Sequence, residues 1–212
     1  KTRIILNGTS DQEVSAINGT GYIPRMQVDK PSGDISFTGT VYFTAGGSCD
    51  IFHWKSGPSL SGTGQVGTYF RGEYTFGIQF DITPSGRFGG FDFQGYRPCV
   101  TEITGEIPTQ NVRFSRKGYS GFKITNGGSW VVSFTGNLEC DTDDYSLGSW
   151  DTVVFRATGS ADQQMSGTGR KVPGNLEIDK SAGTFTFTDN CTISSAFDIT
   201  SGTADSTGNN IA

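Results

Sequence analysis

Short runs of alternating apolar and polar residues, separated by glycine-containing turns, constrain this chain more than any other feature of its sequence. The runs Ile35–Phe43, Tyr74–Ile82 and Trp130–Phe134 alternate in this way. Alternation with a period of two is typical of a β-strand that has one buried face. The 31 glycines among 212 residues show no three-residue period, which excludes collagen. The chain is therefore predicted to be all-β.

Turn sequences recur at short intervals between these runs, among them Pro31–Gly33, Pro84–Gly86 and Ser181–Gly183. Such spacing is typical of sandwiches and barrels, and strands with one wet face are typical of antiparallel sheets. We predict an antiparallel β-sandwich of jelly-roll or immunoglobulin-like type, with a closed β-barrel as the alternative. It would form one domain over residues 1–200. The polar segment 201–212 is predicted to be a terminal arm or a linker.

The sequence contains one internal echo, in which Val28–Thr38 resembles Ile178–Thr188. Two interpretations remain open. The echo is either the trace of a duplication, or the convergence of two hairpins whose turns need the same residue types. The run Ile82–Phe88 has a similar shape, and this favours convergence.

Charge and hydropathy exclude two classes of partner. The formal net charge is −5, and the densest basic cluster holds only Arg113, Arg116 and Lys117. A nucleic-acid-binding domain would carry a basic stripe, so no nucleic-acid partner is expected. Apolar runs stay well short of the roughly 18 residues of a transmembrane helix, so no membrane insertion is expected.

Four widely spaced cysteines indicate the compartment. An even number without any Cys-x-x-Cys pair argues against zinc ribbons and thioredoxin-like redox chemistry, and favours two disulfides in an oxidising compartment. Three pairings are open, and we favour Cys49–Cys99 with Cys140–Cys191. The protein is therefore expected to be secreted or displayed on a cell surface.

Catalytic constellations are weak in this sequence. The single histidine, His53, cannot supply the two or three imidazole ligands of common zinc enzymes, and no Gly-x-Ser-x-Gly motif accompanies it. What remains is pairs of carboxyl groups, such as Glu102 with Glu106, Glu73 with Asp81, or Asp92 with a partner across the sheet. Any acidic β protein offers such pairs, so the sequence leans against an enzyme.

The segment Glu139–Asp151 is the densest in functional groups, because it combines five carboxyl groups with two aromatic rings. A flat ring beside hydrogen-bond acceptors suits a sugar, since the ring covers C–H groups and the carboxylates accept from hydroxyls. Calcium is a weaker option, because the EF-hand spacing and its glycine are missing. No other cofactor is expected. The residues predicted to bind a ligand are Trp54, Asp143, Asp144, Tyr145 and Trp150.

These observations predict an extracellular carbohydrate-binding module, such as the receptor-binding, lectin-like domain of a surface adhesin. Its partner would be a glycan or a glycoprotein receptor. The first alternative is a jelly-roll glycoside hydrolase or polysaccharide lyase that uses two acidic residues. The second is a structural subunit of a fibre or coat, part of a larger surface assembly, for which an unpaired sheet edge is expected.

Overall fold

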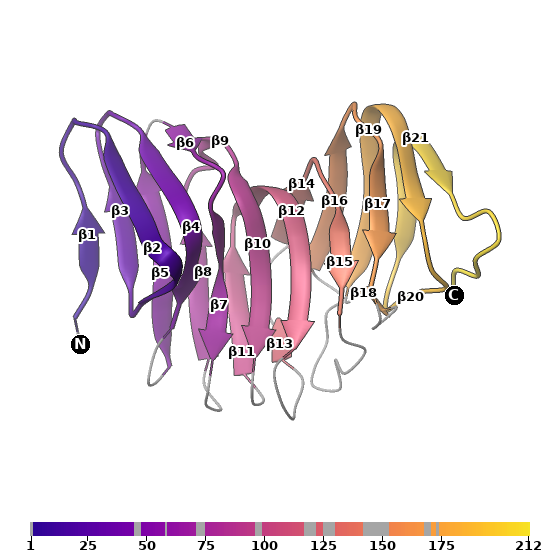
Figure 1. Ribbon diagram of the computed structural model, residues 1–212, viewed down its shortest axis with the longest axis horizontal. Helices are drawn as coiled ribbons and strands as arrows, with labels where there is room; N and C mark the ends of the chain where they lie inside the picture. The colour runs from indigo at the N-terminus through magenta and orange to yellow at the C-terminus, as the bar shows by residue number, and fades with distance from the viewer. Residues whose placement is uncertain are drawn as a thin grey trace.

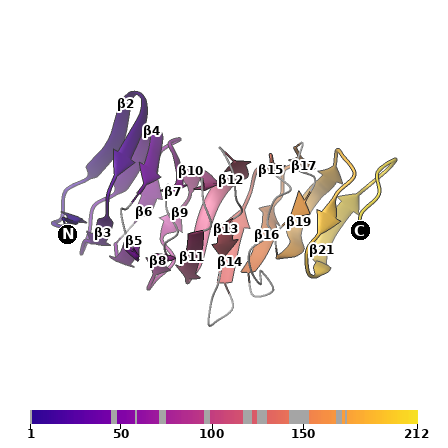
Figure 2. The ribbon, with the colours of Figure 1, turned by 90° about the horizontal axis from the view of Figure 1, so that it is seen from below.

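The chain folds as a β-solenoid of about seven turns, in which successive coils stack along one axis from the N-terminus to the C-terminus (Figures 1 and 2). The computed structural model describes residues 2–44, 48–57, 59–70, 75–95, 99–116, 122–124, 130–141, 153–167, 171–172 and 174–212. All strand pairings among these residues are parallel, as in Ile4–Leu6 beside Met26–Val28. The predicted antiparallel sandwich and the alternative barrel are therefore wrong.

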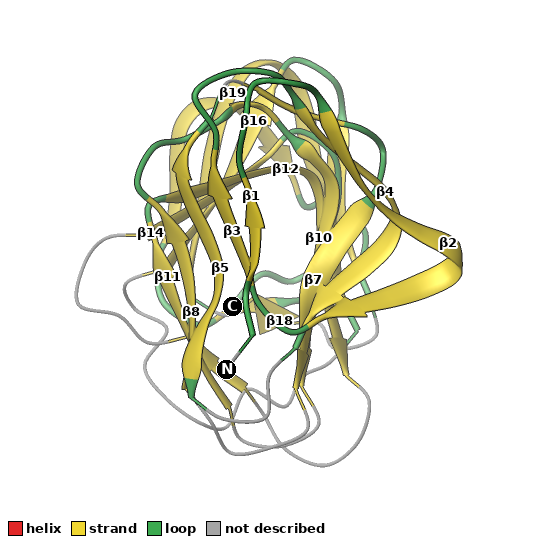
Figure 3. Cartoon of the chain, turned by 90° about the vertical axis from the view of Figure 1, so that its left-hand side faces the viewer, coloured by secondary structure: helices red, strands yellow, loops and turns green. Residues whose placement is uncertain are grey.

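Sheet A forms one wall of the solenoid, and sheet B bends around a corner to form the other two (Figure 3). A small third sheet lies near the C-terminal end. Sheet A contains β1 (Ile4–Leu6), β3 (Met26–Asp29), β5 (Cys49–Ser56), β8 (Thr75–Phe80), β11 (Cys99–Thr104) and β13 (Phe122–Ile124). The N-terminal part of sheet B contains β2 (Gln12–Ile23), β4 (Ile35–Phe43), β6 (Ser59–Ser61), β7 (Gln65–Phe70), β9 (Ser85–Gly86), β10 (Phe88–Gly95) and β12 (Glu106–Arg116). The bend is visible in β4 and β12, because the first and second halves of each pair with different strands.

The C-terminal part of sheet B contains β14 (Trp130–Phe134), β15 (Leu138–Cys140), β16 (Val153–Gly159), β17 (Gln163–Ser166), β19 (Asn175–Phe187) and β21 (Phe197–Asp205). The third sheet pairs β18 (Lys171–Val172) with β20 (Thr192–Ile193).

Each coil places equivalent residues directly above those of the coil before it. Ile4, Met26, Phe52 and Ile78 are paired in turn, and so stand in one column although they are 22 to 26 residues apart in sequence. Met26, Phe52 and Ile78 are each at most 2% exposed, so this column faces the interior. The residues between them, such as Gln27 and His53, face outward.

The alternating pattern predicts the strands correctly, but the antiparallel pairing inferred from it is wrong. Parallel sheets in most proteins are covered on both faces by helices and therefore lack alternation. In this solenoid the walls cover one another's inner faces, and short corners replace the helical crossovers. Each strand consequently has one dry and one wet face, as an antiparallel strand does.

Aromatic side chains fill much of the interior. Phe93 and Phe114 stack with ring centroids 5.2 Å apart, and Phe52 lies 4.8 Å from Phe43 on the opposite wall. These rings are at most 1% exposed. Because each coil adds its own rings to this continuous core, burial increases with every neighbouring coil, as expected for a repeat protein.

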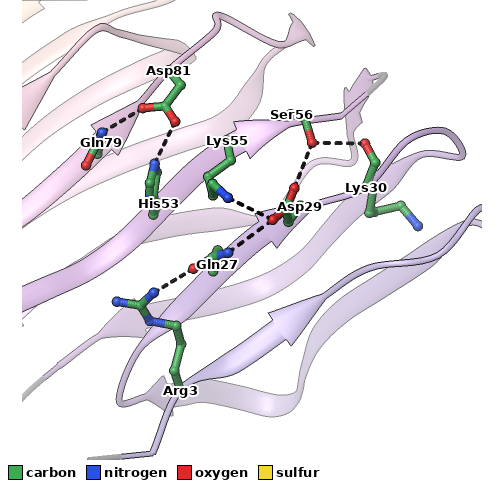
Figure 4. Close-up of polar contacts among 9 residues, drawn as sticks. All are labelled: Arg3, Gln27, Asp29, Lys30, His53, Lys55, Ser56, Gln79 and Asp81. Carbon is green, nitrogen blue, oxygen red and sulfur yellow. Dashed lines mark hydrogen bonds and ion pairs between the residues drawn. The ribbon is translucent and has the colours of Figure 1, made fainter.

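A buried lysine stabilises one corner near the N-terminus. Lys30 is 1% exposed, and its Nζ donates to the carbonyl of Ser10 at 2.6 Å and to Gln12 Oε1 at 3.1 Å. On the next coil, the hydroxyl of Ser56 donates to Asp29 Oδ1 and to the Lys30 carbonyl, both at 3.2 Å (Figure 4). The corner is thus tied to the coils before and after it.

The same corner recurs near the C-terminus. Lys180 is also 1% exposed, and its Nζ donates to the carbonyl of Ala161 and to Gln163 Oε1, both at 2.6 Å. The hydroxyl of Ser201 donates to Asp179 Oδ1 at 2.8 Å and to the Lys180 carbonyl at 3.0 Å. The lysine and serine hydrogen bonds of the first corner therefore all have counterparts in the second.

These two corners are the echoed segments Val28–Thr38 and Ile178–Thr188. The likeness extends to the coil before each, where Gly8–Gln12 reads Gly-Thr-Ser-Asp-Gln and Gly159–Gln163 reads Gly-Ser-Ala-Asp-Gln. It also extends to the coil after each, where both strand pairs carry a register shift just before the aspartate. A single converging turn does not explain likeness over three coils, so the structure favours duplication.

Strand β2 departs from the regular coil. Ser15 pairs with Thr38 and Thr20 with Thr40, so four residues, 16–19, stand opposite the single residue Gly39. A side chain at Gly39 would place its Cβ 2.6 Å from the Ala16 carbonyl oxygen, and this glycine has a φ of 70°. Glycine at this position therefore permits the excursion, which stands out from the wall in Figure 3.

The C-terminal segment 201–212, which the sequence predicts to be an arm or a linker, contributes to the last coil. Strand β21 continues to Asp205, and Ile211 forms a bridge with Cys191.

Candidate functional site

The outer face of sheet A carries polar residues that mainly bond to one another. Figure 4 shows this network. Gln27 joins Arg3 to Asp29, Lys55 lies 3.0 Å from Asp29, and His53 Nε2 lies 3.0 Å from Asp81 Oδ2. The polar side chains of this face are therefore held in place by one another.

The carboxyl pKa values on this face reflect these pairs. The hydrogen bond from Lys55 is the main cause of a lowered pKa at Asp29. Burial raises the pKa of Asp81, but hydrogen bonds from His53 and Gln79 outweigh it and leave that pKa below its usual value. Both groups are therefore ionised at neutral pH and act as surface acceptors.

The outer face of sheet B differs, because it brings aromatic, amide and charged groups together in columns. One column holds Tyr22, Tyr42, Gly67, Asp92, Arg113, Glu139 and Ser166. A second column, two residues earlier on each strand, holds Gln65, Gly90, Asn111, Asn137 and Gln164. Neighbouring members of a column are about 4.8 Å apart, the separation of adjacent strands.

Three tyrosines form what we call the tyrosine patch, composed of Tyr22, Tyr42 and Tyr69. The ring of Tyr22 lies 6.0 Å from that of Tyr42 in a stacked arrangement and 5.0 Å from that of Tyr69. Tyr22 is 53% exposed, whereas the other two are 7% exposed. The patch therefore offers one accessible ring that rests on two fixed ones.

A buried polar network fixes Tyr42. Gly67 leaves room for its ring, because a Cβ there would lie 2.9 Å from Tyr42 Cε1. The Tyr42 hydroxyl donates to Asp92 Oδ2 at 2.8 Å, and Ser115 donates to Asp92 Oδ1 at 2.7 Å. Gln94 donates to Asp92 Oδ2 at 2.8 Å. Burial, reinforced by Asp92, raises the pKa of Tyr42, so its hydroxyl keeps its proton.

Beside the patch lies a shallow depression of about 410 Å³, which we call the sheet B groove. Its polar lining comes from four strands, β7, β12, β15 and β17, and from the corner that precedes β15. The lining side chains are Gln65, Asn111, Arg113, Asn137, Glu139, Gln164 and Ser166.

The charged part of the groove is a cation between two acids. Arg113 donates to Asp141 Oδ2 from Nε at 3.1 Å and from its second terminal nitrogen at 2.5 Å, and its Nε lies 3.3 Å from Glu139 Oε2. The hydrogen bond to Asp141 raises the pKa of Arg113. Burial raises the pKa of Glu139, and Asp141 raises it further, although Arg113 opposes the change.

The structure places the predicted ligand-binding residues elsewhere. Trp54 lies in the core with 0% exposure and stacks on Phe80 at 6.4 Å, so a ligand outside the solenoid cannot reach its ring. The other predicted binding residues, Asp143, Asp144, Tyr145 and Trp150, lie outside the described residues. Of the acidic segment that contains them, only Glu139–Asp141 is described.

The structure does not bring together the carboxyl pairs that the sequence suggested, as far as their residues are described. Asp81 pairs with His53, Asp92 is 1% exposed beneath Tyr42, and Glu73 is outside the described residues. Nothing is described of the Glu102 side chain that was paired with Glu106. Within the described residues, no group of three or more His, Cys, Asp or Glu side chains could hold a metal ion.

Among the described residues the structure records no disulfide, and the favoured pairing of Cys140 with Cys191 stays a prediction. The Cys99 side chain lies outside the described part, so the pairing of Cys49 with Cys99 stays a prediction. Burial raises the pKa of the Cys191 thiol to about 11, which makes that thiol a poor nucleophile at neutral pH.

Sequence reasoning missed the sheet B groove because its members are far apart along the chain. The available signal was a spacing close to one coil, as between Arg113 and Glu139, which are neighbours in register. No protein-family model, curated protein or solved structure matches the chain. A search of the described residues also finds no helix long and apolar enough to cross a membrane.

Proposed function

We propose that the protein is an extracellular carbohydrate-binding module, of the kind that serves as the receptor-binding part of a surface adhesin, and that the outer face of sheet B binds the glycan. The observation that carries this proposal is the tyrosine patch beside the sheet B groove. A sugar has C–H faces that pack on an aromatic ring and hydroxyl groups that need donors and acceptors. The two regions supply these two kinds of contact side by side.

The column geometry supports a chain of sugars rather than a single one. Gln65, Asn111, Asn137 and Gln164 lie on successive or nearly successive strands, about 4.8 Å apart per strand. That step is close to the advance of one ring in an extended polysaccharide. A glycan lying along the solenoid axis would therefore meet an amide side chain at most of these steps, with a gap at Gly90.

The charges of the groove favour neutral glycans. Arg113 is already paired with Asp141 and Glu139, so the groove has more acid than base. A sulfated or uronic acid polymer would be repelled at this position, whereas neutral hydroxyls can donate to the carboxylates.

A glycan array probed with the purified protein tests the proposal, with neutral and anionic glycans side by side. We expect binding to neutral oligosaccharides. The Tyr22→Ala variant should weaken it about tenfold, equivalent to about 1.4 kcal/mol. The matched control is Lys55→Ala on the sheet A face, which should bind as the unmodified protein does. Equal loss in both variants, or an empty array, would count against this site.

A second candidate function, glycoside hydrolysis, is favoured by one observation. Burial keeps the pKa of Glu139 above its usual value, and Asp141 lies beside it. A carboxyl group with a raised pKa beside a second carboxyl group is the arrangement that glycosidases use. Glu139 would then protonate the leaving oxygen while the second carboxylate assists.

Reducing-end release from any glycan that binds distinguishes the two functions. If the groove is catalytic, Glu139→Gln should abolish release while binding persists. If the protein only binds, no release is seen with either form, and the first proposal stands alone.

A further inference from the structure

The sheet B groove is continued by a second depression toward the C-terminal coils. This depression, which we call the distal pocket, has a volume of about 340 Å³ and is lined by Asn137, Asp162, Gln163, Gln164 and Thr186. Asn137 and Gln164 also line the sheet B groove. The two depressions therefore adjoin each other on the outer face of sheet B.

One register column connects the two depressions. It runs along six consecutive strands of sheet B, from β7 to β19, through Gln65, Gly90, Asn111, Asn137, Gln164 and Thr186. Both end strands have a further strand beside them, β4 next to β7 and β21 next to β19. The column therefore begins and ends within the sheet, and a chain lying along it can continue past either end.

The step of this column at Gly90 has no side chain of its own, but the Gln65 side chain covers it. A Cβ at Gly90 would lie 3.5 Å from Gln65 Cγ and 3.8 Å from Gln65 Nε2. The amide of Gln65 therefore extends over the glycine, and the row of polar groups runs on from β7 to β12.

Some groups of the column are fixed by the fold, whereas others are free. Asn111 Oδ1 accepts from the backbone N–H of Asn137 at 2.8 Å, and Asn137 Oδ1 accepts from the backbone N–H of Gln164 at 3.0 Å. In the part of the chain that the structure describes, the amides of Gln65 and Gln164 and the hydroxyl of Thr186 have no hydrogen-bond partner. Each of these three groups can both donate to and accept from a hydroxyl of a ligand.

The two ends of this surface differ in chemistry. Tyr22 lies on β2, two strands beyond β7, so the distance from the tyrosine patch to Thr186 is seven strand steps, or about 34 Å. Among the described residues that line the distal pocket, none is aromatic, and Asp162 adds an acid. The first end therefore offers a ring for stacking, and the second offers hydrogen bonds alone.

We propose, on the basis of the carbohydrate-binding function above, that the tyrosine patch, the sheet B groove and the distal pocket form one trough. It binds an internal stretch of about seven sugars of a neutral, unbranched polysaccharide, at about one sugar per strand. Gln164 and Thr186 are then binding residues for the far sugars. A short oligosaccharide binds beside the tyrosine patch, where stacking adds to hydrogen bonding, and only a longer one reaches Thr186.

Isothermal titration calorimetry tests the proposal, with neutral oligosaccharides of two to ten sugars prepared from β-glucan, mannan and unsubstituted xylan. We expect the affinity for one of these series to rise about threefold with each added sugar, the equivalent of about one net hydrogen bond, and to level off at about seven sugars.

Two variants probe the two ends of the trough. Thr186→Val keeps the shape of the side chain but removes its hydroxyl, so it should weaken binding of an eight-sugar probe about threefold and leave a three-sugar probe unchanged. Gln65→Ala, near the tyrosine patch, should weaken both probes. Thr186→Ser keeps the hydroxyl and is the matched control, which should bind both probes as the unmodified protein does. Thermal unfolding of each variant verifies that it folds.

The outcomes separate failure of the trough from failure of carbohydrate binding. Affinity that levels off at three or four sugars, or an unchanged affinity of Thr186→Val for the eight-sugar probe, overturns the trough and leaves carbohydrate binding in place. Absence of binding at every length in all three series overturns the carbohydrate proposal and the trough with it.

Discussion

The Lys30 corner and the Lys180 corner have the same hydrogen bonds but lie at different positions along the solenoid axis. Both lysines donate to a backbone carbonyl and to a glutamine. The first corner is followed by β5 and several further coils, whereas the second is followed by β21 alone. The comparison teaches that the same hydrogen bonds produce the same corner whatever follows it along the solenoid.

The difference between the two corners also shows which residues matter. Ser10 is replaced by Ala161, with no effect on the bond, since the lysine uses the backbone oxygen. Pro31 is replaced by Ser181. The lysine, the glutamine and the glycine recur in both corners. Substituting the same residue in each corner therefore allows the losses of stability to be compared.

The largest expected effect is substitution of the corner glycines. Gly33 has a φ of 75°, and a Cβ there would lie 2.3 Å from the Thr9 carbonyl oxygen. Gly183 has a φ of 70° and a clearance of 2.7 Å to the Ser160 oxygen. The backbone conformation alone costs an alanine about 1 to 2 kcal/mol. With the clash added, Gly33→Ala should lower the free energy of unfolding by about 3 kcal/mol.

Gly183→Ala should cost less than Gly33→Ala, since its clash is milder. Urea unfolding of both variants measures the difference, and Gly208→Ala is the control for positive φ without contact, as nothing lies within 4 Å of it. Equal losses in the two corner variants would show that contact distance is not decisive.

Replacing the lysines comes next in size. Lys30→Met keeps the aliphatic stem but leaves the Ser10 carbonyl and Gln12 Oε1 without their donor, at a cost of about 2 kcal/mol. Lys180→Met removes the donor of two equivalent bonds and should cost about as much, about 2 kcal/mol. Lys55→Met, with a side chain 41% exposed, should change stability by less than about 0.5 kcal/mol.

The pH dependence of Lys180 sharpens this comparison. Burial lowers the pKa of Lys180 below its usual 10.5, and Asp162 opposes this only in part. Between the folded and unfolded pKa values the unfolded chain binds more protons, so this lysine adds stability as pH rises toward 10.5. Stability measured against Lys180→Met should therefore increase over that window. A difference that stays flat, or falls, contradicts the shift.

The smallest expected effect is at the serines that tie each corner to the following coil. Ser56→Ala and Ser201→Ala each remove a hydroxyl that shares its one proton between two acceptors, at about 1 kcal/mol. Because β21 pairs with β19 alone within the described residues, the loss of Ser201 should mainly loosen β21. Amide exchange of β21 compared with β5 measures this. Protection of β21 that survives Ser201→Ala would mean that the serine bond does not hold the last coil.

The strands were predictable from local alternation, as in Ile35–Phe43, which is β4 in full. Their direction was not, because one dry and one wet face arises equally from antiparallel sheets and from parallel walls. The echo at Lys30 and Lys180 carried the missing information, since repeats point to coils. A single turn considered without its neighbouring coils favours convergence instead, and so conceals the repeat.

The candidate site was harder to predict from the sequence than the strand direction. Tyr22, Tyr42 and Tyr69 are 20 and 27 residues apart, and only the register of the coils brings them together. Trp54 is an aromatic residue near a loop in the sequence, but at 0% exposure it belongs to the core. The sequence next to an aromatic residue does not show whether its ring faces outward or inward. The pairing register between coils is needed to decide this.

The excursion of β2 has a consequence for how such a surface can change. The four residues 16–19 stand opposite Gly39 alone, Ile17 is 83% exposed, and nothing lies within 4 Å of a Cβ at Gly19. Residues inserted there would leave the pairing on either side intact. In the paired strands, the number of residues is therefore fixed by the stacking of the coils. In the excursion beside Tyr22, the number of residues is free to vary. A longer excursion could add contacts to a ligand at Tyr22 without changing the fold of the coil.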